Sequence, residues 1–334
     1  MLFDIEKNGV SQSMLMNFLK CRQFTKLYIE KYRPIISASY FRYGEICHAI
    51  LEEIYKQIMN DKRNEVPTNA ETIKLIDEKV EDYRDKNKII INPEEEQLAE
   101  IQSVMIEKTL SGYFKYWYKE DFKKVKWLEQ EKEFKFKLNN NVVPIRGIRD
   151  AAYSTKEGIY LFETKTKAQI DESTLSELLA FDFQVMLYAV SMNNDYGKYP
   201  IACRYNIIRR PSNRLGKNEN LEQFGKRLEE EVKKRPEYYY VRYMIDISKK
   251  QLEEFQKELE IIINEFVAWN EGKLKTFKNI GSCVTKFGVC QYLPICAYND
   301  FSKFRKTDEV HSELMNENKT GGTKNGNKRV SITA

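Results

Sequence analysis

The sequence predicts an α/β protein whose mixed sheet is flanked by helices and preceded by a helical amino-terminal part. Apolar residues fall near helical spacing through much of residues 1–126, polar and apolar residues alternate from Trp127, and helical and extended patterns then succeed one another. We expect a helical part over 1–126, a sheet-bearing core over 127–275, a cysteine segment over 276–305 and a disordered tail over 306–334.

The amino-terminal part should contain four helices. Ser11 and Ser13 suit the cap of a helix over about 12–32, and Pro34 closes that helix because proline cannot continue it. A second helix is expected over about 41–60, and the charged stretch 70–120 should hold two more.

The core should open with a three-stranded meander. Residues 129–138 alternate with the period of a half-buried strand, three asparagines at 139–141 supply a turn, and residues 142–154 and 158–166 form the second and third strands. The elements expected after the meander are a helix over about 173–193, a strand over 201–210, a basic helix over 220–234, a strand over 238–248 and a helix over 249–271.

Composition excludes several classes of protein. Hydrophobic residues make up 42% and charged residues 31% of the 334 residues, and there is no uncharged apolar run of about 18 residues that could span a bilayer. Asp4 and Glu6 stand where a signal peptide carries basic and apolar residues, so we expect a cytoplasmic protein with no membrane partner. Its six cysteines should then be thiols or metal ligands. The net charge of +5 permits a nucleic-acid partner without requiring one.

Two carboxylates and a lysine lie on neighbouring predicted strands. Glu163 and Lys165 are two positions apart, so both side chains leave the same face of the third strand, and Asp150 on the second strand can join them there. Converging carboxylates need a cation, and oxygen ligands suit Mg²⁺ or Mn²⁺. The simpler interpretation is that these three residues are solvated strand positions, because the E-x-K pattern is short.

Four segments resemble motifs of one nuclease family. They are GIRD at 147–150, FETKTK at 162–167, GEICHAILEEIY at 44–55 and DFQVMLYAV at 182–190, and they occur in the family's order. The chain therefore resembles the PD-(D/E)XK nuclease superfamily, and within it the RecB-like exonuclease branch. The resemblance implies a restriction-endonuclease-like core. Arg149 stands where the family has proline before the aspartate.

The resemblance also implies an activity and a set of site residues. The activity is Mg²⁺- or Mn²⁺-dependent hydrolysis of DNA phosphodiesters, most simply exonucleolytic trimming of single-stranded or duplex DNA ends. The alternatives are a DNA-binding or nuclease subunit of a helicase or recombination complex, and a structure-specific endonuclease. The implied metal ligands are His48, Asp150, Glu163 and the Thr164 carbonyl; the implied catalytic residues are Asp150, Glu163, Lys165, Gln184 and Tyr188.

His48 and Lys165 have further interpretations. His48 could instead be a helix-face histidine packed in the core. Lys165 can orient or deprotonate the attacking water and stabilise charge on the phosphate. Gln184 and Tyr188 lie on one helix face at i and i+4, where they would support the site.

Four cysteines are separated in an unusual way. Cys283, Cys290 and Cys296 form a C-x6-C-x5-C run, and Cys21 lies far upstream. Zinc ligands usually pair through shorter loops, whereas four thiolates suit a [4Fe–4S] cluster. The one-plus-three arrangement resembles the iron staple of the RecB-like branch, although Arg22 follows Cys21 where relatives often have proline. Alternatively, the four are separate buried thiols, as we expect for Cys47 and Cys203.

Basic residues gather in two segments, the first at 207–217 beside the end of the predicted strand 201–210 and the second further along the chain. They lie among tyrosines, an arrangement that can hold phosphates and stack unpaired bases. Solvated helix faces give the same pattern. The residues are Arg209, Arg210, Arg214 and Lys217 in the first segment, and Lys226, Arg227, Lys233, Lys234, Arg235 and Arg242 in the second.

Overall fold

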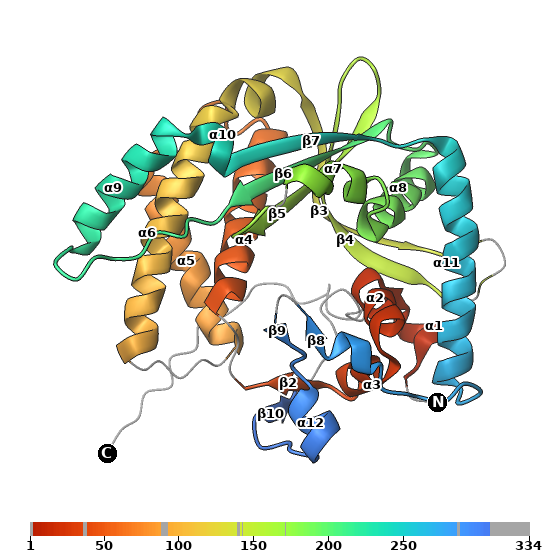
Figure 1. Cartoon of the computed structure of the whole chain (residues 1–334). Helices are drawn as coiled ribbons and strands as arrows, with labels where there is room; N and C mark the ends of the chain where they lie inside the picture. The colour runs from red at the N-terminus through yellow and green to blue at the C-terminus, as the bar shows by residue number, and fades with distance from the viewer. Residues whose placement is uncertain are drawn as a thin grey trace, which may run out of the picture.

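A mixed six-stranded sheet forms the centre of the molecule (Figure 1). The computed structural model describes residues 3–35, 39–87, 93–138, 141, 143–170, 172–285 and 288–307. Strands β3 (Lys126–Phe136), β4 (Ile145–Ser154) and β5 (Ile159–Lys167) form an antiparallel meander. Next to β5, β6 (Ala202–Arg209) runs parallel and β7 (Tyr240–Asp246) pairs antiparallel with β6. The predicted fold class, a mixed sheet flanked by helices, is confirmed.

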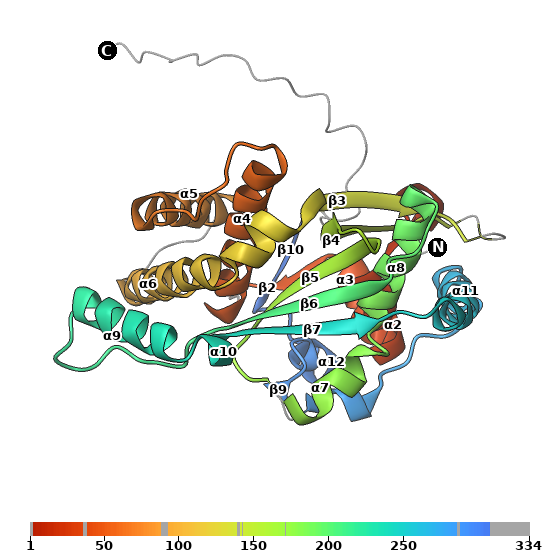
Figure 2. The same cartoon turned by 90° about the horizontal axis from the view of Figure 1, so that it is seen from above.

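Helices cover both faces of this sheet. One apolar core joins it to α2 (Gln12–Lys20), α8 (Phe183–Tyr196) and α11 (Lys249–Asn270). The other joins it to α4 (Ser39–Met59), α6 (Pro93–Tyr116) and α9 (Leu221–Lys234), with α5 (Asn69–Asn87) packed outside. Figure 2 shows these two groups of helices on opposite sides of the strands. Both faces of the central strands, such as β6, are therefore largely buried, whereas the outer strands β3 and β7 keep exposed residues.

Two predicted helices are each divided in the structure. The helix expected over 12–32 is α2 and α3 (Arg22–Ile29), because Cys21 between them has extended backbone with φ −167°. The helix expected over 173–193 is α7 (Glu172–Leu179) and α8, because the Asp182 side chain caps α8 by accepting a hydrogen bond from the Val185 amide. In both cases the apolar residues keep helical spacing across the break, so the sequence pattern predicts one continuous helix.

Short elements complete the fold. They are α1 (Ile5–Asn8), β1 (Val10–Ser11), β2 (Tyr32–Pro34), the π-helix η1 (Lys119–Lys124), α10 (Pro236–Tyr239), the 3₁₀ helix η2 (Ile280–Ser282), β8 (Val284–Thr285), β9 (Gly288–Val289), α12 (Leu293–Tyr298) and β10 (Phe304–Lys306). None of the helices in the described part of the chain is both long and apolar enough to cross a bilayer.

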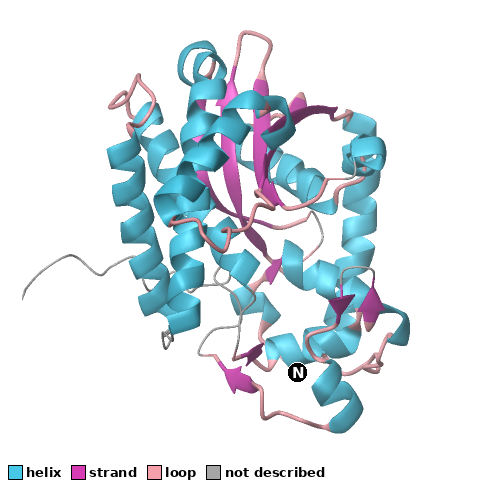
Figure 3. Cartoon of the chain, turned by 60° about the vertical axis from the view of Figure 1, so that its left-hand side comes forward, coloured by secondary structure: helices cyan, strands magenta, loops and turns pink. Residues whose placement is uncertain are grey.

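Segments from near both ends of the described chain meet in a terminal lobe, formed by α3, β2, η2, β8, β9, α12 and β10 (Figure 1). Figure 3 shows the short strands of this lobe below the main sheet. β2 pairs antiparallel with β10, and the Tyr292 hydroxyl donates to the Tyr32 carbonyl over 2.7 Å. Lys306, which the sequence assigns to the disordered tail, ends β10. The rest of that predicted tail from 308 onwards, and the predicted turn residues 139 and 140, lie outside the described residues.

A buried ion pair fixes β4 to its neighbours. The Arg149 guanidinium, fully buried, donates to both Glu129 oxygens of β3 at 2.6 and 3.1 Å and to Asp195 of α8 at 2.6 Å. Tyr196 donates to the same glutamate over 2.6 Å. Arg149 thus ties strand β4 to strand β3 and helix α8.

Removing one partner of this buried network should destabilise the fold. Arg149→Met leaves the Glu129 carboxylate buried without its cation, so the free energy of unfolding should fall by about 3–5 kcal/mol. Lys74→Met, which breaks an exposed pair, should change it by less than about 1 kcal/mol. Urea denaturation of both variants checks this, and equal small losses would show that the network contributes little.

Candidate functional site

The site lies where one edge of β4 changes its partner. β5 pairs with this edge at 151–154, and β1 pairs with it at 145 and 146, while β3 covers the opposite edge. Among the described strands none pairs with the edge between these two stretches. At this point a side chain replaces the backbone pairing: Asp150 Oδ2 accepts a hydrogen bond from the Thr164 amide over 2.7 Å. This hydrogen bond links β4 to β5 at the candidate residues Asp150 and Thr164.

Two glycines allow the close approach of the surrounding elements. A Cβ at Gly44 would lie 2.8 Å from Thr166 Oγ1, so glycine lets α4 approach β5. A Cβ at Gly147 would lie 2.6 Å from the Phe134 ring of β3. His48 is one turn beyond Gly44 on α4, and this approach brings it to the site.

Three side chains converge on one point. Ligand atoms of His48, Glu131 and Asp150 all lie within 4.8 Å of one another, and His48 Nδ1 is 3.8 Å from Asp150 Oδ2. Thr164 and Glu52 line the same small cavity. Sequence reasoning brought His48, Asp150 and Thr164 to this site but missed Glu131.

Glu131 has an unusual backbone for a strand residue. Its φ of 44° lies in the left-handed region, which costs a non-glycine residue about 1–3 kcal/mol. The register on either side sets Gln130 opposite Ala151 and Lys132 opposite Arg149, so Glu131 comes opposite Asp150. The alternating pattern of 129–138 predicts a regular strand, and nothing in it signals this deviation.

A second group of side chains lies beside the first. Lys165 Nζ donates to Glu163 Oε1, so the two side chains leave the same face of β5, as their spacing predicts. Lys165 Nζ also donates to Gln184 Oε1 over 2.9 Å, and Gln184 Nε2 donates to the Tyr188 hydroxyl over 3.0 Å. Helix α8 therefore holds the lysine through two residues at i and i+4.

Crowding shifts the pKa values of these groups. Burial and the nearby Asp150 carboxylate raise the pKa of Glu163 to about 8, and burial with Asp150 and Glu52 raises the pKa of Glu131 to about 9. Burial by itself would lower the pKa of Lys165. The carboxylates of Glu163 and Asp150 outweigh this effect, so the pKa of Lys165 is raised above its usual value. The lysine is therefore a fixed cation, and one cation does not neutralise the group.

The donor set fits a hard divalent cation. Glu163 Oε2 is buried and has no hydrogen-bond partner among the described residues, although buried polar atoms are nearly always paired. Burial lowers the pKa of His48, which keeps its imidazole neutral and able to donate a lone pair. Carboxylate oxygens with one imidazole suit Mg²⁺ or Mn²⁺. The residues at the site therefore accommodate the metal that the motifs imply.

The four separated cysteines line one cavity in the terminal lobe. It is bounded by Cys21, Cys283, Cys290 and Cys296 together with Lys20, Phe24 and Tyr292. Burial raises the pKa of the Cys290 and Cys296 thiols. By contrast, Cys47 and Cys203 are fully buried in the two sheet cores, as expected of small apolar residues.

The basic residues at the end of β6 and beyond it have different surroundings. The Arg242 side chain is only 7% exposed and donates to both Asp121 oxygens, so it stabilises the fold and offers nothing to a ligand. Arg209 turns inward and donates to the Tyr238 carbonyl over 2.9 Å. Lys226, Arg227 and Arg235 form ion pairs with glutamates of the same helix or the preceding loop. Arg210, Arg214 and Lys217 instead line a pocket.

Comparison with known proteins identifies the family that these motifs suggest. The model of the PD-(D/E)XK nuclease superfamily matches residues 9–297, well over half of the chain. Among solved structures, the chain is similar to the "Putative exonuclease" from Eubacterium rectale, at 10% sequence identity and a TM-score of 0.45, covering 82% of this chain and 85% of that one. No curated protein matches the sequence.

The raised pKa of Glu163 makes the stability of the metal-free protein depend on pH. Because the folded protein holds this proton up to a pH of about 8 and the unfolded chain loses it near 4.5, stability should fall as pH rises between those values. The slope for one group is at most about 1.4 kcal/mol per pH unit. Urea denaturation in EDTA at several pH values measures it. Glu163→Gln should flatten this dependence, and an unchanged slope would contradict the assignment.

Proposed function

The chain belongs to the PD-(D/E)XK nuclease superfamily, and from this premise we propose that it is a metal-dependent exonuclease that trims DNA ends. Membership implies hydrolysis of phosphodiesters with a divalent metal and a DNA substrate. The proposal goes further in assigning the residues, the mode of cleavage, the RecB-like branch and a second metal centre.

The arrangement around Asp150 carries the proposal. Its carboxylate lies 3.8 Å from His48 Nδ1 and accepts a hydrogen bond from the Thr164 amide over 2.7 Å. The ion pair between Lys165 and Glu163 lies on the adjacent strand β5. A structural ion-pair network would have its carboxylates satisfied by cations or donors. Here Glu163 Oε2 lacks any described donor.

Each residue has a role that its contacts support. His48, Glu131, Asp150, Glu163 and the Thr164 carbonyl would hold the metal. When bound, Mg²⁺ or Mn²⁺ supplies Lewis-acid polarisation of the phosphate and a more acidic water. Lys165, fixed as a cation by Glu163, orients the attacking water and stabilises negative charge on the phosphate rather than removing a proton.

Gln184 and Tyr188 act on the lysine. The hydrogen bond from Lys165 Nζ to Gln184 and the bond from Gln184 to the Tyr188 hydroxyl fix the position of the ammonium group. Tyr188 is buried, so it supports Gln184 from within the core. This Q-x-x-x-Y pair is the feature that favours the RecB-like branch and, through it, cleavage from ends.

A circular substrate separates the two modes of cleavage. The wild-type protein with Mg²⁺ or Mn²⁺ should degrade linear DNA from its ends and leave covalently closed and single-stranded circles intact. End-labelled and circular DNA of the same sequence, resolved on gels, provide the measurement. Cleavage of circles at the rate of linear DNA would favour the structure-specific endonuclease instead.

Loss of single site residues should abolish cleavage without unfolding the protein. Asp150→Asn, Glu163→Gln and Lys165→Ala should each lower the rate by at least about 10²-fold, because the first two remove charged metal ligands and the third removes the cation that stabilises the phosphate. Lys165→Ala should keep most of its Mn²⁺ affinity. End-labelled DNA assays and calorimetric Mn²⁺ titration measure the two effects.

The third carboxylate has a matched control on its own strand. Glu131→Gln and His48→Ala should weaken Mn²⁺ binding by about tenfold or more, whereas Glu133→Gln, an exposed glutamate two positions along β3, should leave it unchanged. Equal affinity in Glu131→Gln and Glu133→Gln would exclude Glu131 from the ligand set.

We also propose a [4Fe–4S] cluster in the terminal lobe. The four cysteines line one cavity, although Cys21 and the other three are far apart in sequence. Zinc ligands usually pair through short loops, which these four cysteines lack, whereas four thiolates suit a [4Fe–4S] cluster.

The cluster should be structural. Cys290→Ser or Cys21→Ser should lose visible absorption after anaerobic purification and become protease-sensitive near both chain ends, while Cys203→Ser should keep the colour. Asn279 and Ser282 bind the Lys20 carbonyl at 2.8 and 3.0 Å, so the segments also hold together by hydrogen bonds. Zinc in place of iron by elemental analysis would contradict the cluster, and four free thiols in a colourless wild type would exclude any metal there.

A further inference from the structure

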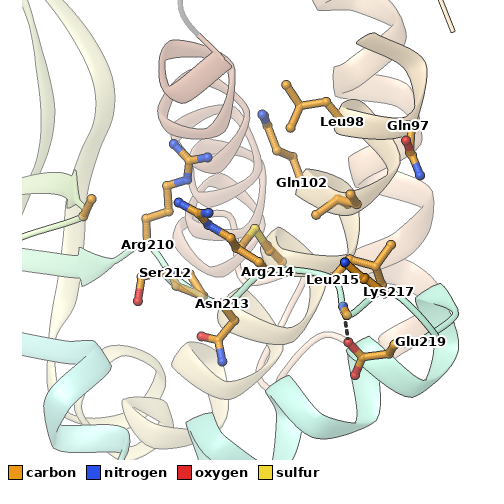
Figure 4. A pocket seen from close by; sticks show the side chains of 15 residues that line it. Gln97, Leu98, Gln102, Arg210, Ser212, Asn213, Arg214, Leu215, Lys217 and Glu219 are labelled. Atoms are coloured by element: carbon orange, nitrogen blue, oxygen red, sulfur yellow. Dashed lines mark hydrogen bonds between the residues drawn. The ribbon is translucent and has the colours of Figure 1, made fainter. Parts of the chain in front are cut away.

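A large pocket lies beside the carboxy-terminal ends of β5 and β6. Its volume is about 870 Å³, and it is enclosed by helix α6 and the loop 210–219 that follows β6 (Figure 4). Ala168, just past the end of β5, also lines it. Figure 4 shows Arg210 and Arg214 directed into the space between the loop and α6, where Leu98 and Gln102 face them.

The pocket has two chemically distinct walls. The loop contributes three cations, Arg210, Arg214 and Lys217. Helix α6 contributes an apolar wall, which consists of Leu98, Ile101 and Met105 and is extended by Leu215 of the loop. The one carboxylate among the lining residues, Glu219, is paired with Arg227 at 2.7 and 2.8 Å. The pocket therefore carries net positive charge next to apolar surface.

The loop backbone is fixed while its cations are left available. Glu219 accepts a hydrogen bond from the Gly216 amide over 2.9 Å, and Arg227 donates to the Arg214 carbonyl over 3.0 Å. Asn213 donates to Glu231 of α9 over 2.6 Å. Within the described part of the chain, the side chains of Arg214 and Lys217 are exposed and form no ion pair. A ligand would thus meet a preorganised loop, which lowers the entropic cost of binding.

Two elements lead from the candidate active site to this pocket. Along β5, Ala168 lies five residues after Glu163, or about 16 Å at 3.3 Å per residue. Along α4, Tyr43 lies five residues before His48, or about 7.5 Å at the rise of a helix. The centre of its ring is 5.4 Å from the guanidinium carbon of Arg210. A polynucleotide bound at the active site could therefore extend into the pocket.

We propose that the pocket binds the single-stranded part of a DNA substrate, a few nucleotides from the phosphate that is cleaved. This rests on the proposed function. The three cations contact successive phosphates, and unpaired bases pack on the apolar wall of α6. Paired and stacked bases of a duplex cannot present their faces to that wall, so the pocket selects an unpaired strand.

Two double variants of equal charge test the cationic wall. Arg214→Gln with Lys217→Gln removes two pocket cations, and Lys249→Gln with Lys250→Gln removes two exposed lysines of α11. Fluorescence anisotropy in EDTA, with a labelled single-stranded oligonucleotide at several salt concentrations, gives the affinity. The pocket variant should bind at least about tenfold more weakly. The steepness of its log–log salt dependence should fall by about 1.4, whereas the α11 variant should match the wild type.

A third variant tests the apolar wall. Leu98→Ser should weaken binding of the same oligonucleotide without changing the salt dependence, because it removes no phosphate contact. Ile261→Ser, which alters an exposed residue of α11, should have no effect. All pocket variants should hydrolyse a small diester, bis(p-nitrophenyl) phosphate, at the wild-type rate, since the active site is unchanged. A lower rate would place the damage in that site and overturn the inference.

Failure of this inference differs from failure of the proposed function. A wild type that binds and cleaves DNA, with a pocket variant of unchanged affinity and salt dependence, would refute the pocket alone. Equal losses for blunt duplex and single strand would refute selection of an unpaired strand. A wild type that neither binds nor cleaves DNA would refute the proposed function itself.

Discussion

Carboxylates gathered around Asp150 of β4 are the constraint on which the candidate site depends. Ligand atoms of His48, Glu131 and Asp150 lie within 4.8 Å of one another. Glu163, which is paired with Lys165 on β5, is close enough for the Asp150 charge to raise its pKa. Like charges this close cannot all ionise without compensation. The fold tolerates the arrangement because protons, the lysine or a metal can each neutralise part of it. The same repulsion between carboxylates therefore lowers the stability of the metal-free protein and strengthens its binding of a cation.

The surrounding fold supplies the geometry that this cost requires. β1 and β5 share one edge of β4 and leave the interval in which Asp150 bonds to the Thr164 amide. Gly44 brings α4 against β5, and α8 brings Gln184 to the lysine. The buried Arg149 network ties β4 to α8 beside the same aspartate. Elements from both faces of the sheet thus contribute to one site.

Local pattern was enough to predict some of this and not the rest. The spacing of Glu163 and Lys165 predicts their shared face because side chains alternate along any strand. The break at Cys21 could not be predicted, because flanking residues keep helical spacing on both sides of it. Glu131 was missed since its left-handed backbone is imposed by the strands around it. From the sequence, Arg149 is only a departure from the family's proline. Its role depends on hydrogen bonds to Glu129 and Asp195, which lie far from it in the chain.

The same limit applies to charge on the surface. Ten basic residues from the end of β6 onwards look alike in sequence, yet contacts with residues far away in the chain give them different roles. Arg242 is buried against Asp121, over a hundred residues away, whereas Arg214 and Lys217 stay on a loop whose backbone is held by Glu219 and Arg227. Only the folded chain separates cations that hold the protein together from cations that a ligand can reach.

Proton release on metal binding tests the central claim most directly. Calorimetric titration of Mn²⁺ into the metal-free protein at a pH near 7, in two buffers of different ionisation enthalpy, counts the protons displaced. The raised pKa values of Glu163 and Glu131 predict that at least one proton leaves for each metal bound, and that Glu163→Gln releases fewer. Metal binding without proton release, or release unchanged in that variant, would contradict the account.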